Sequence, residues 1–479
     1  MIAGGHLRRP QAVAAAGVTA IGLGVGVSVA QGGSGTAILW LAGLGAFATL
    51  AFPRVAFFGL VAILPLDLHI RSGFVLDSPL DSLRLLIFMA LVARGAWRGR
   101  RSLWWPVGLC LGVYLLAVGL SVVNEVLGLH IAILYNSWRT AFKLLTYIAF
   151  GISGLMVLRD GADLRRAYWL LVAGLAISSA YAIYQYRIGD FGRIYHLLYP
   201  LNDATPWAGR PPGLLNYANS AAGYINLLLP IIAVVTFTAR TMGTRMLSGA
   251  TLVLGLVALL VTQSRGGWLA TAVMMFLVFI RAVPALIRLP SLMVLGGAVY
   301  LALFQIPFTV QRIQALSGSD LHNREALWKA ALALFSLSPA VGVGIGSYQD
   351  LYHAQASLSA YFGDPQIQAH QLYLQVLAET GILGFTAFMG LLATVAVRGW
   401  RGHILAIAES DSIRTGFTFG AVIAIVGVMV HGLVDVLFQA SPQFAGLFWL
   451  LVLIAGSARV ASRAATVAAP EPAELALEH

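Results

Sequence analysis

The sequence predicts an all-α polytopic membrane protein with about 12–14 transmembrane helices and one large helical loop on one side of the membrane. Two observations predict this class. Apolar residues make up 59% of the 479 residues and charged residues only 10%, whereas soluble domains carry about 25% charged residues. Apolar runs close to the roughly 20 residues that cross a bilayer recur along the whole chain. The mean hydropathy of +0.83 agrees with this class.

The apolar runs give the expected spans in chain order, and several of them are short, so the expected number stays a range. The candidate spans are 12–30, 36–51, 55–68, 81–94, 104–122, 138–157, 167–185, 217–238, 246–262, 268–281, 290–305, 374–396, 414–435 and 443–459. The predicted parts of the chain are an N-terminal transmembrane bundle (1–305), a periplasmic helical segment (306–373), C-terminal transmembrane helices (374–460) and a disordered cytoplasmic tail (461–479).

The basic residues predict the orientation of these spans. Most of the 30 Lys and Arg residues lie in one set of alternate connections, which runs from Arg8 and Arg9 to Arg459 and Arg463. Basic residues are enriched in cytoplasmic loops, so we expect this set and both termini in the cytoplasm. The first span resembles a signal peptide, but we expect it to be retained because its removal would break the alternation.

Composition also excludes some classes of function. The net charge of +11 comes from basic residues scattered between the spans, so we expect no nucleic-acid partner. Cys110 is the only cysteine, which excludes an intrachain disulfide and a cysteine metal cluster. No Asp-x-Asp pair occurs in the chain, so a metal-assisted mechanism has no obvious ligands.

Arg265 is the most informative basic residue on the predicted outer side. It lies in TQSRGGW, between two apolar runs that leave almost no loop. An arginine within the membrane costs roughly 2.5–3.5 kcal/mol on insertion scales, so a carboxylate or an anionic ligand should compensate for it. Gly266 and Gly267 would let such a ligand approach the main chain closely. The alternative is an interfacial arginine that reaches toward lipid headgroups.

A second candidate anion site lies at Arg210, which precedes PPGLLNYANS. The two prolines and the glycine predict an irregular turn before the next helix. Asn216 and Asn219 then place side-chain amides near the helix N-terminus, where anions bind readily. The alternative is an ordinary loop with a helix cap.

The segment between the spans 290–305 and 374–396 is too polar to cross a membrane and should form short helices. In LHNREALWKAALALFSLSP, we expect Asn323 to cap a helix that ends before Pro339. Arg324 and Trp328 are four residues apart and share a helix face, which could lie on the membrane surface or over a cavity. The following GVGIGSY lacks the strand context of a dinucleotide fingerprint, so we expect a tight turn.

His370 begins AHQLYLQVLAETGILG, at the start of the next span. Histidine is the natural general base near neutral pH. At this place it would meet a substrate at the boundary between membrane and water. The alternative is a hydrogen-bonded interfacial histidine.

These four motifs together resemble the superfamily of O-antigen ligases and Wzy-type polymerases. RPPGLLNYANSAAGY, TQSRGGWLA, NREALWKAALALFSLSPAVGVGIGSY and AHQLYLQVLAETGILG occur in the expected order between residues 210 and 385. The first 200 residues are similar only as generic spans. The superfamily includes ligases, polysaccharide polymerases, protein O-oligosaccharyltransferases and proteins labelled bicarbonate transporters. This chain has His370-Gln371 where the family often has His-Asn, which leaves the histidine in place but weakens any assignment to one subfamily.

The resemblance implies a GT-C-like, metal-independent, inverting glycosyltransferase of the bacterial inner membrane that uses no cofactor. The donor would be a glycan on undecaprenyl pyrophosphate, and the acceptor would be the lipid A core or another glycan. The donor pyrophosphate would be held by the arginines, and His370 would take the acceptor proton. The implied catalytic residues are His370, Arg265 and Arg210, and the implied substrate contacts are Arg324, Asn216, Asn219, Trp328 and Tyr373.

The acceptor and the general class remain open at this point. We favour a ligase over a polymerase because the outer segment is one compact loop. A secondary transporter would also have Gly- and Pro-interrupted helices, but transporter sites usually lie at the midplane of the membrane. Here Asp435 and Glu379 fall near span ends. A third possibility is a membrane scaffold without catalytic activity, which would tolerate Arg265→Ala.

Overall fold

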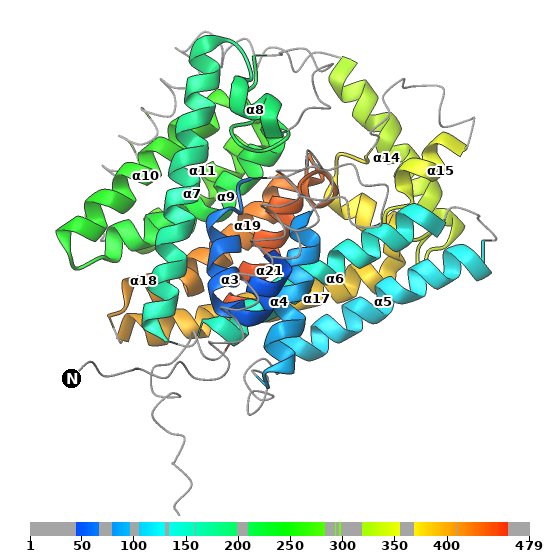
Figure 1. Cartoon of the computed structure of the whole chain (residues 1–479). Helices are drawn as coiled ribbons and strands as arrows, with labels where there is room; N and C mark the ends of the chain where they lie inside the picture. Colours follow the sequence, from blue (N-terminus) through cyan, green and yellow to red (C-terminus); the bar gives the residue numbers. More distant parts are fainter. Residues whose placement is uncertain are drawn as a thin grey trace, which may run out of the picture.

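The computed structural model describes residues 45–66, 79–95, 105–129, 134–158, 160–198, 209–282, 293, 297, 319–354, 368–408 and 410–457. These residues form helices joined by turns, and no strand occurs among them (Figure 1). Seven helical segments in this part of the chain are long and apolar enough to cross a membrane. The predicted all-α polytopic membrane class is therefore confirmed.

The segments that could span a membrane follow the predicted spans closely. They are α5 (Val107–Leu127), α6 (Leu134–Val157), α7 (Gly161–Ile188), α9 (Ala218–Thr238), α10 (Met242–Val261), α17 (Leu372–Ala408) and the continuous run of α18 (Ser412–Thr415), a π-helical turn (Gly416–Gly420) and α19 (Ala421–His431). Shorter helices complete the described bundle: α3 (Pro53–Ala62), α4 (Pro79–Ala93), α8 (Arg193–Leu198), α11 (Arg265–Ala282), α20 (Leu437–Ala440) and α21 (Pro442–Gly456).

Several predictions fall outside the described residues. The span 12–30 and the tail 461–479 lie there entirely, as does 290–305 apart from two helical positions. The number of 12–14 helices and the bounds of the four predicted parts of the chain therefore stay predictions.

The centre of the bundle is the most apolar part of the described chain. Every residue of α21 is buried, and so is almost all of α9 before Thr236. A helix that is apolar all round belongs in such an interior. By contrast, α5 exposes Leu109, Val113, Leu116 and Leu120, which recur at helical spacing on one side. This exposed apolar stripe suits contact with lipid chains.

The segment after α11 contributes α14 (Ser319–Leu337) and α15 (Tyr348–Ala354), which lie at the opposite end of the molecule from α18 (Figure 1). The helix ends before Pro339 as predicted, but it begins at Ser319, so the prediction that Asn323 caps it is wrong. Ser319 and Asp320 supply residues that favour a helix start one turn earlier. The predicted turn is confirmed, because Gly342 and Gly344 have φ of 77° and 111°.

This turn is joined to α17 by main-chain hydrogen bonds. α17 breaks at Gly381, which has φ 63° and ψ −171°. The N–H groups of Val343 and Gly344 donate to the carbonyls of Ala378 and Glu379, both at 3.0 Å. On the other side of the break, the N–H groups of residues 382 and 383 donate to the carbonyls of residues 339 and 340 at 2.9 and 3.1 Å. The segment that carries α14 and α15 is therefore fixed to α17 by main-chain hydrogen bonds. The first turn of α17 follows His370.

Candidate active site

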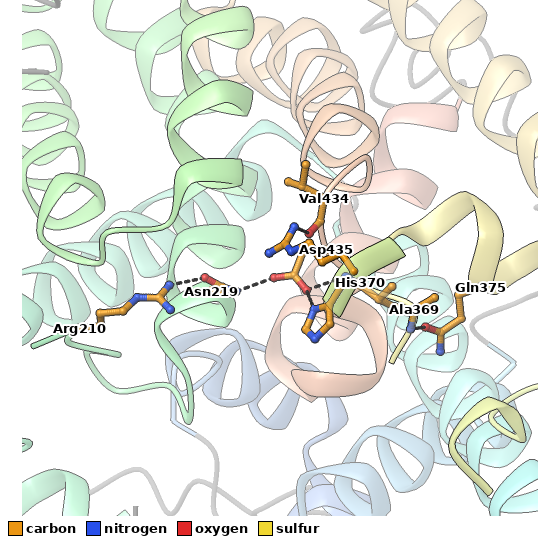
Figure 2. Close-up of polar contacts among 9 residues, drawn as sticks. Arg210, Asn219, Ala369, His370, Gln375, Val434 and Asp435 are labelled. Carbon is orange, nitrogen blue, oxygen red and sulfur yellow. Dashed lines mark hydrogen bonds and ion pairs between the residues drawn. The ribbon is translucent and has the colours of Figure 1, made fainter. Parts of the chain in front are cut away.

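Four elements that are distant in sequence are joined by hydrogen bonds, and Figure 2 shows Arg210, Asn219, His370 and Asp435. They are the loop 209–217 before α9, the turn 262–264 before α11, the start of α17 and the turn 432–436 after α19. Side chains from these elements form one connected polar network.

His370 and Asp435 form the pair at one end of this network. Nδ1 of His370 lies 3.1 Å from Oδ1 of Asp435. The Asp435 side chain is 8% exposed, whereas that of His370 is 39% exposed. Because an ionised carboxylate only accepts hydrogen bonds, Nδ1 carries the proton and donates it. The second ring nitrogen, Nε2, is then the basic atom.

Asp435 remains a carboxylate in this environment. Burial alone would raise its pKa, but the hydrogen bond and charge of His370, the nearby His431 and the N–H of Val436 outweigh burial and hold the pKa of Asp435 below its usual value. The Val436 N–H donates to Oδ1 of Asp435 at 2.8 Å. A charged, fixed carboxylate orients the imidazole ring and stabilises its protonated form.

Asn219 connects this pair to Arg210. Its Oδ1 accepts a hydrogen bond from Nη2 of Arg210 at 2.6 Å, and its Nδ2 donates to Oδ2 of Asp435 at 2.6 Å (Figure 2). Nε of Arg210 also donates to the carbonyl of Thr262 at 3.2 Å. The chain Arg210–Asn219–Asp435–His370 thus links a fixed cation to a basic nitrogen.

Arg265 is the first residue of α11, directly after the three-residue turn from α10. A side chain added at Gly266 would place its Cβ 2.7 Å from Cδ2 of His431 and 2.5 Å from Cγ2 of Val434. The start of α11 therefore packs against the turn that carries Asp435. A helix N-terminus that begins with arginine favours an anion at this place.

Two residues at the site have strained main chains. Gln263 and His370 have φ of 55° and 47°, and they are two of the three non-glycine residues with positive φ in the described part of the chain. Such conformations are costly for residues with a Cβ and often mark functional positions. The Gln263 amide donates to the carbonyl of Gly209 at 2.9 Å, which joins the two loops on the Arg210 side.

Helix α14 contacts the turn 432–436 through Arg324. Its Nη1 donates to the carbonyl of Val434 at 2.8 Å. Trp328 follows one helical turn later, and its buried indole N–H makes no hydrogen bond within the described residues. The predicted contacts Arg324 and Trp328 therefore lie on the helix that packs over the His370–Asp435 pair.

The remaining residues predicted to contact substrate make hydrogen bonds within the protein. The Tyr373 hydroxyl donates to the carbonyl of Met429 at 2.8 Å and joins α17 to α19. The half-buried Asn216 accepts the Tyr195 hydroxyl at its main-chain carbonyl, at 2.8 Å. Tyr348, the first residue of α15, is buried and belongs to the core.

Asp435 is a member of the site that the sequence alone does not predict. The sequence indicates only an acid near a span end and no partner for it. The available signal was the spacing of His431 and Asp435, four residues apart at the end of an apolar run. No group of three His, Cys, Asp or Glu side chains in the described ranges could hold a metal ion.

One comparison with known proteins gives a match. Residues 250–389 match the model of a family described as O-antigen ligase. The matched range contains Arg265, Arg324, Trp328, His370 and Tyr373, whereas Arg210, Asn219 and Asp435 lie outside it. Curated proteins give no match to this chain.

Proposed function

We propose that this chain, in which residues 250–389 match the O-antigen ligase family, is a metal-independent, inverting glycosyltransferase. It moves a glycan from undecaprenyl pyrophosphate to an acceptor hydroxyl on the periplasmic face of the bacterial inner membrane. The observation that carries this proposal is the half-exposed His370 on a buried, charged Asp435, which Asn219 joins to Arg210.

His370 is the proposed general base. Its Nε2 takes the proton of the acceptor hydroxyl as the acceptor oxygen attacks the anomeric carbon of the donor sugar. The bond from that carbon to the phosphate oxygen breaks on the opposite face, and the pyrophosphate leaves with its electron pair. The anomeric configuration is thereby inverted. Asp435 stabilises the imidazolium that forms.

Arg210 and Arg265 are the proposed pyrophosphate ligands. Each charge-assisted hydrogen bond to the donor would contribute about 1.5–3 kcal/mol. The same cations would stabilise the negative charge that develops on the leaving group. Asn219 already fixes one edge of the Arg210 guanidinium, so that cation is oriented before the donor arrives.

Arg324, Trp328 and Asn216 are the proposed contacts to sugar or phosphate groups. Arg324 and Trp328 reach the site from α14. Asn219 and Tyr373 are proposed as positioning residues, because the Asn219 amide and the Tyr373 hydroxyl donate hydrogen bonds to other residues of the protein.

The proposed acceptor is the lipid A core, which makes the protein an O-antigen ligase. The alternative within the same superfamily is an O-antigen or exopolysaccharide polymerase, whose acceptor is a second lipid-linked glycan. Both donor and acceptor are anchored in the membrane, so both reach the site from the lipid.

Purified protein in detergent tests this proposal. It would receive a pyrophosphate-linked glycan with or without a lipid A core acceptor, in the presence of EDTA. We expect glycan on the lipid A core; a ladder from donor alone would identify a polymerase. Equal absence of product from the wild-type and His370→Ala proteins would contradict the transferase proposal for these substrates.

A further inference from the structure

The main chain on both sides of His370 is fixed by hydrogen bonds. Before it, the N–H of Ala369 donates to Oε1 of Gln375 at 3.1 Å. After it, the N–H of Leu372 donates to the carbonyl of Gly432 at 2.7 Å. His370 itself has φ 47°, a conformation that persists only where the surrounding structure enforces it.

Gln375 is the side chain that enforces this conformation from within α17. It is buried and lies in the first turns of the helix, and its side chain reaches back toward the helix N-terminus, as helical side chains do. Its Nε2 donates to Oε1 of Glu379 at 3.0 Å, one turn further along the same face. Figure 2 shows Gln375 directed at the main chain of Ala369, next to His370.

Glu379 links this support to the outer segment. Its side chain is buried, and its main-chain carbonyl accepts the N–H of Gly344 at 3.0 Å, beside the break at Gly381. A Cβ at Gly342 would lie 2.4 Å from the Glu379 carbonyl carbon, so the turn packs directly on this residue. One line of contacts therefore runs from the outer segment through Glu379 and Gln375 to the main chain beside His370.

We infer that Gln375 and Glu379 are positioning residues that hold the His370 main chain so that its imidazole reaches Asp435 and the acceptor hydroxyl together. This inference rests on the proposed role of His370 as the base. Neither side chain touches a reacting atom. A displacement of about 1 Å at the base can cost about 100-fold in rate, so the support should be visible in kcat rather than in donor binding.

The first test is Gln375→Met in the full-length protein, which keeps the side-chain length and removes both hydrogen bonds. We expect kcat for glycan transfer to fall about 10–100-fold. KM for the donor should stay within about twofold, because the proposed donor ligands Arg210 and Arg265 lie on other elements, the loop before α9 and the start of α11. The matched control is Thr380→Val. Thr380 is equally buried in α17, and its hydroxyl donates to the carbonyl of Val376 one turn earlier in the same helix, so we expect its kcat to match the wild type.

A rescue pair separates positioning from a purely structural role. Gln375→Glu alone places a carboxylate beside Glu379 and should lower kcat. Adding Glu379→Gln lets the new carboxylate accept both the Ala369 N–H and the new amide, so the double variant should recover most of the lost rate. Thermal unfolding and gel filtration would show that the compared variants are folded. If Gln375→Met does not fold, the comparison of the single and double variants decides.

Two results would overturn the inference: kcat of folded Gln375→Met equal to that of Thr380→Val, or a double variant no faster than Gln375→Glu. His370→Ala measured in parallel keeps the two proposals apart. If His370→Ala transfers glycan at the wild-type rate, the proposed base is wrong. If His370→Ala is inactive while folded Gln375→Met is fully active, only the positioning inference fails.

Discussion

Two of the acid–base pairs among the described residues have opposite characters: Asp81–Arg84 in α4, and His370–Asp435 between the start of α17 and the turn after α19. Asp81 and Arg84 are three residues apart in one helix, are both fully buried, and join at 2.5 Å. The Arg84 guanidinium lies 5.0 Å from the centre of the Tyr147 ring, and α21 closes over it at Gly446. This pair is sealed on all sides.

The His370–Asp435 pair is partly exposed to solvent. We call it the open pair and the fully buried Asp81–Arg84 pair the sealed pair. Its members lie 65 residues apart, one on a strained main chain, and the histidine is 39% exposed while the aspartate is 8% exposed. A sealed ion pair in an apolar interior serves packing and orientation. A carboxylate buried behind an exposed imidazole leaves one ring nitrogen for chemistry. Exposure on one side thus separates a reactive pair from a structural one.

The largest effect should come from Asp435→Asn. The neutral amide no longer fixes the Nδ1–H form of His370 and no longer stabilises the imidazolium, so we expect glycan transfer to fall about 10²–10⁴-fold. Initial rates with saturating donor would measure it. The protein should stay folded, since the amide oxygen can still accept the hydrogen bond from Asn219. Wild-type activity in Asp435→Asn would show that the pair is structural, like Asp81–Arg84.

The opposite result is expected at the sealed pair. Arg84→Met leaves Asp81 as a buried charge without its partner, so the free energy of unfolding should fall by about 3–5 kcal/mol. The double variant Asp81→Leu/Arg84→Met should recover much of this loss, because no buried charge remains. Unfolding in detergent would measure stability, and transfer per folded molecule should not change. A loss of transfer in the folded double variant would break the comparison.

A smaller effect is expected at Asn219, which bridges Arg210 and the Asp435 carboxylate of the open pair. Asn219→Ala removes the contacts from Arg210 to Asp435, each a charge-assisted bond, and should lower kcat about tenfold or more. Initial rates with saturating donor would measure the change, and gel filtration would check folding. A folded Asn219→Ala variant with wild-type kcat would remove Asn219 from the mechanism.

The smallest effect concerns acid stability. The pKa of the Asp435 carboxyl lies below its usual value in the folded protein. Its contribution to stability is therefore complete above the ordinary aspartate pKa of about 3.9 and is lost as pH falls through the lower folded value. The stability difference between wild type and Asp435→Asn, from unfolding at stepped pH, should persist at pH 5 and shrink below about pH 4. A difference that vanished already at pH 5 would mean that the carboxyl is not held charged.

Composition and apolar runs were enough to predict the fold class, because a span must be apolar for about 20 residues. The end of α14 was also readable, since Pro339 cannot continue a helix. The start of α14 was not, because Ser319 and Asp320 compete with Asn323 as starting residues and the sequence does not rank them.

The site was predicted in part, for a physical reason. His370 and the arginines are charged or titratable groups at span ends, which are visible in a sequence. The partner of His370 was not visible, because the turn that brings Asp435 to it depends on the packing of α19, α11 and α17. The support from Gln375 depends on the positive φ of His370, which no local pattern predicts.

The most direct test of the central claim measures donor binding and glycan transfer on the same preparation of His370→Ala. The open pair is proposed to supply the base and the arginines to hold the donor. We therefore predict that the variant binds the pyrophosphate-linked glycan like the wild type and transfers it at least about 100-fold more slowly. Transfer at the wild-type rate would contradict the account, and so would a loss of binding that explains the whole loss of transfer.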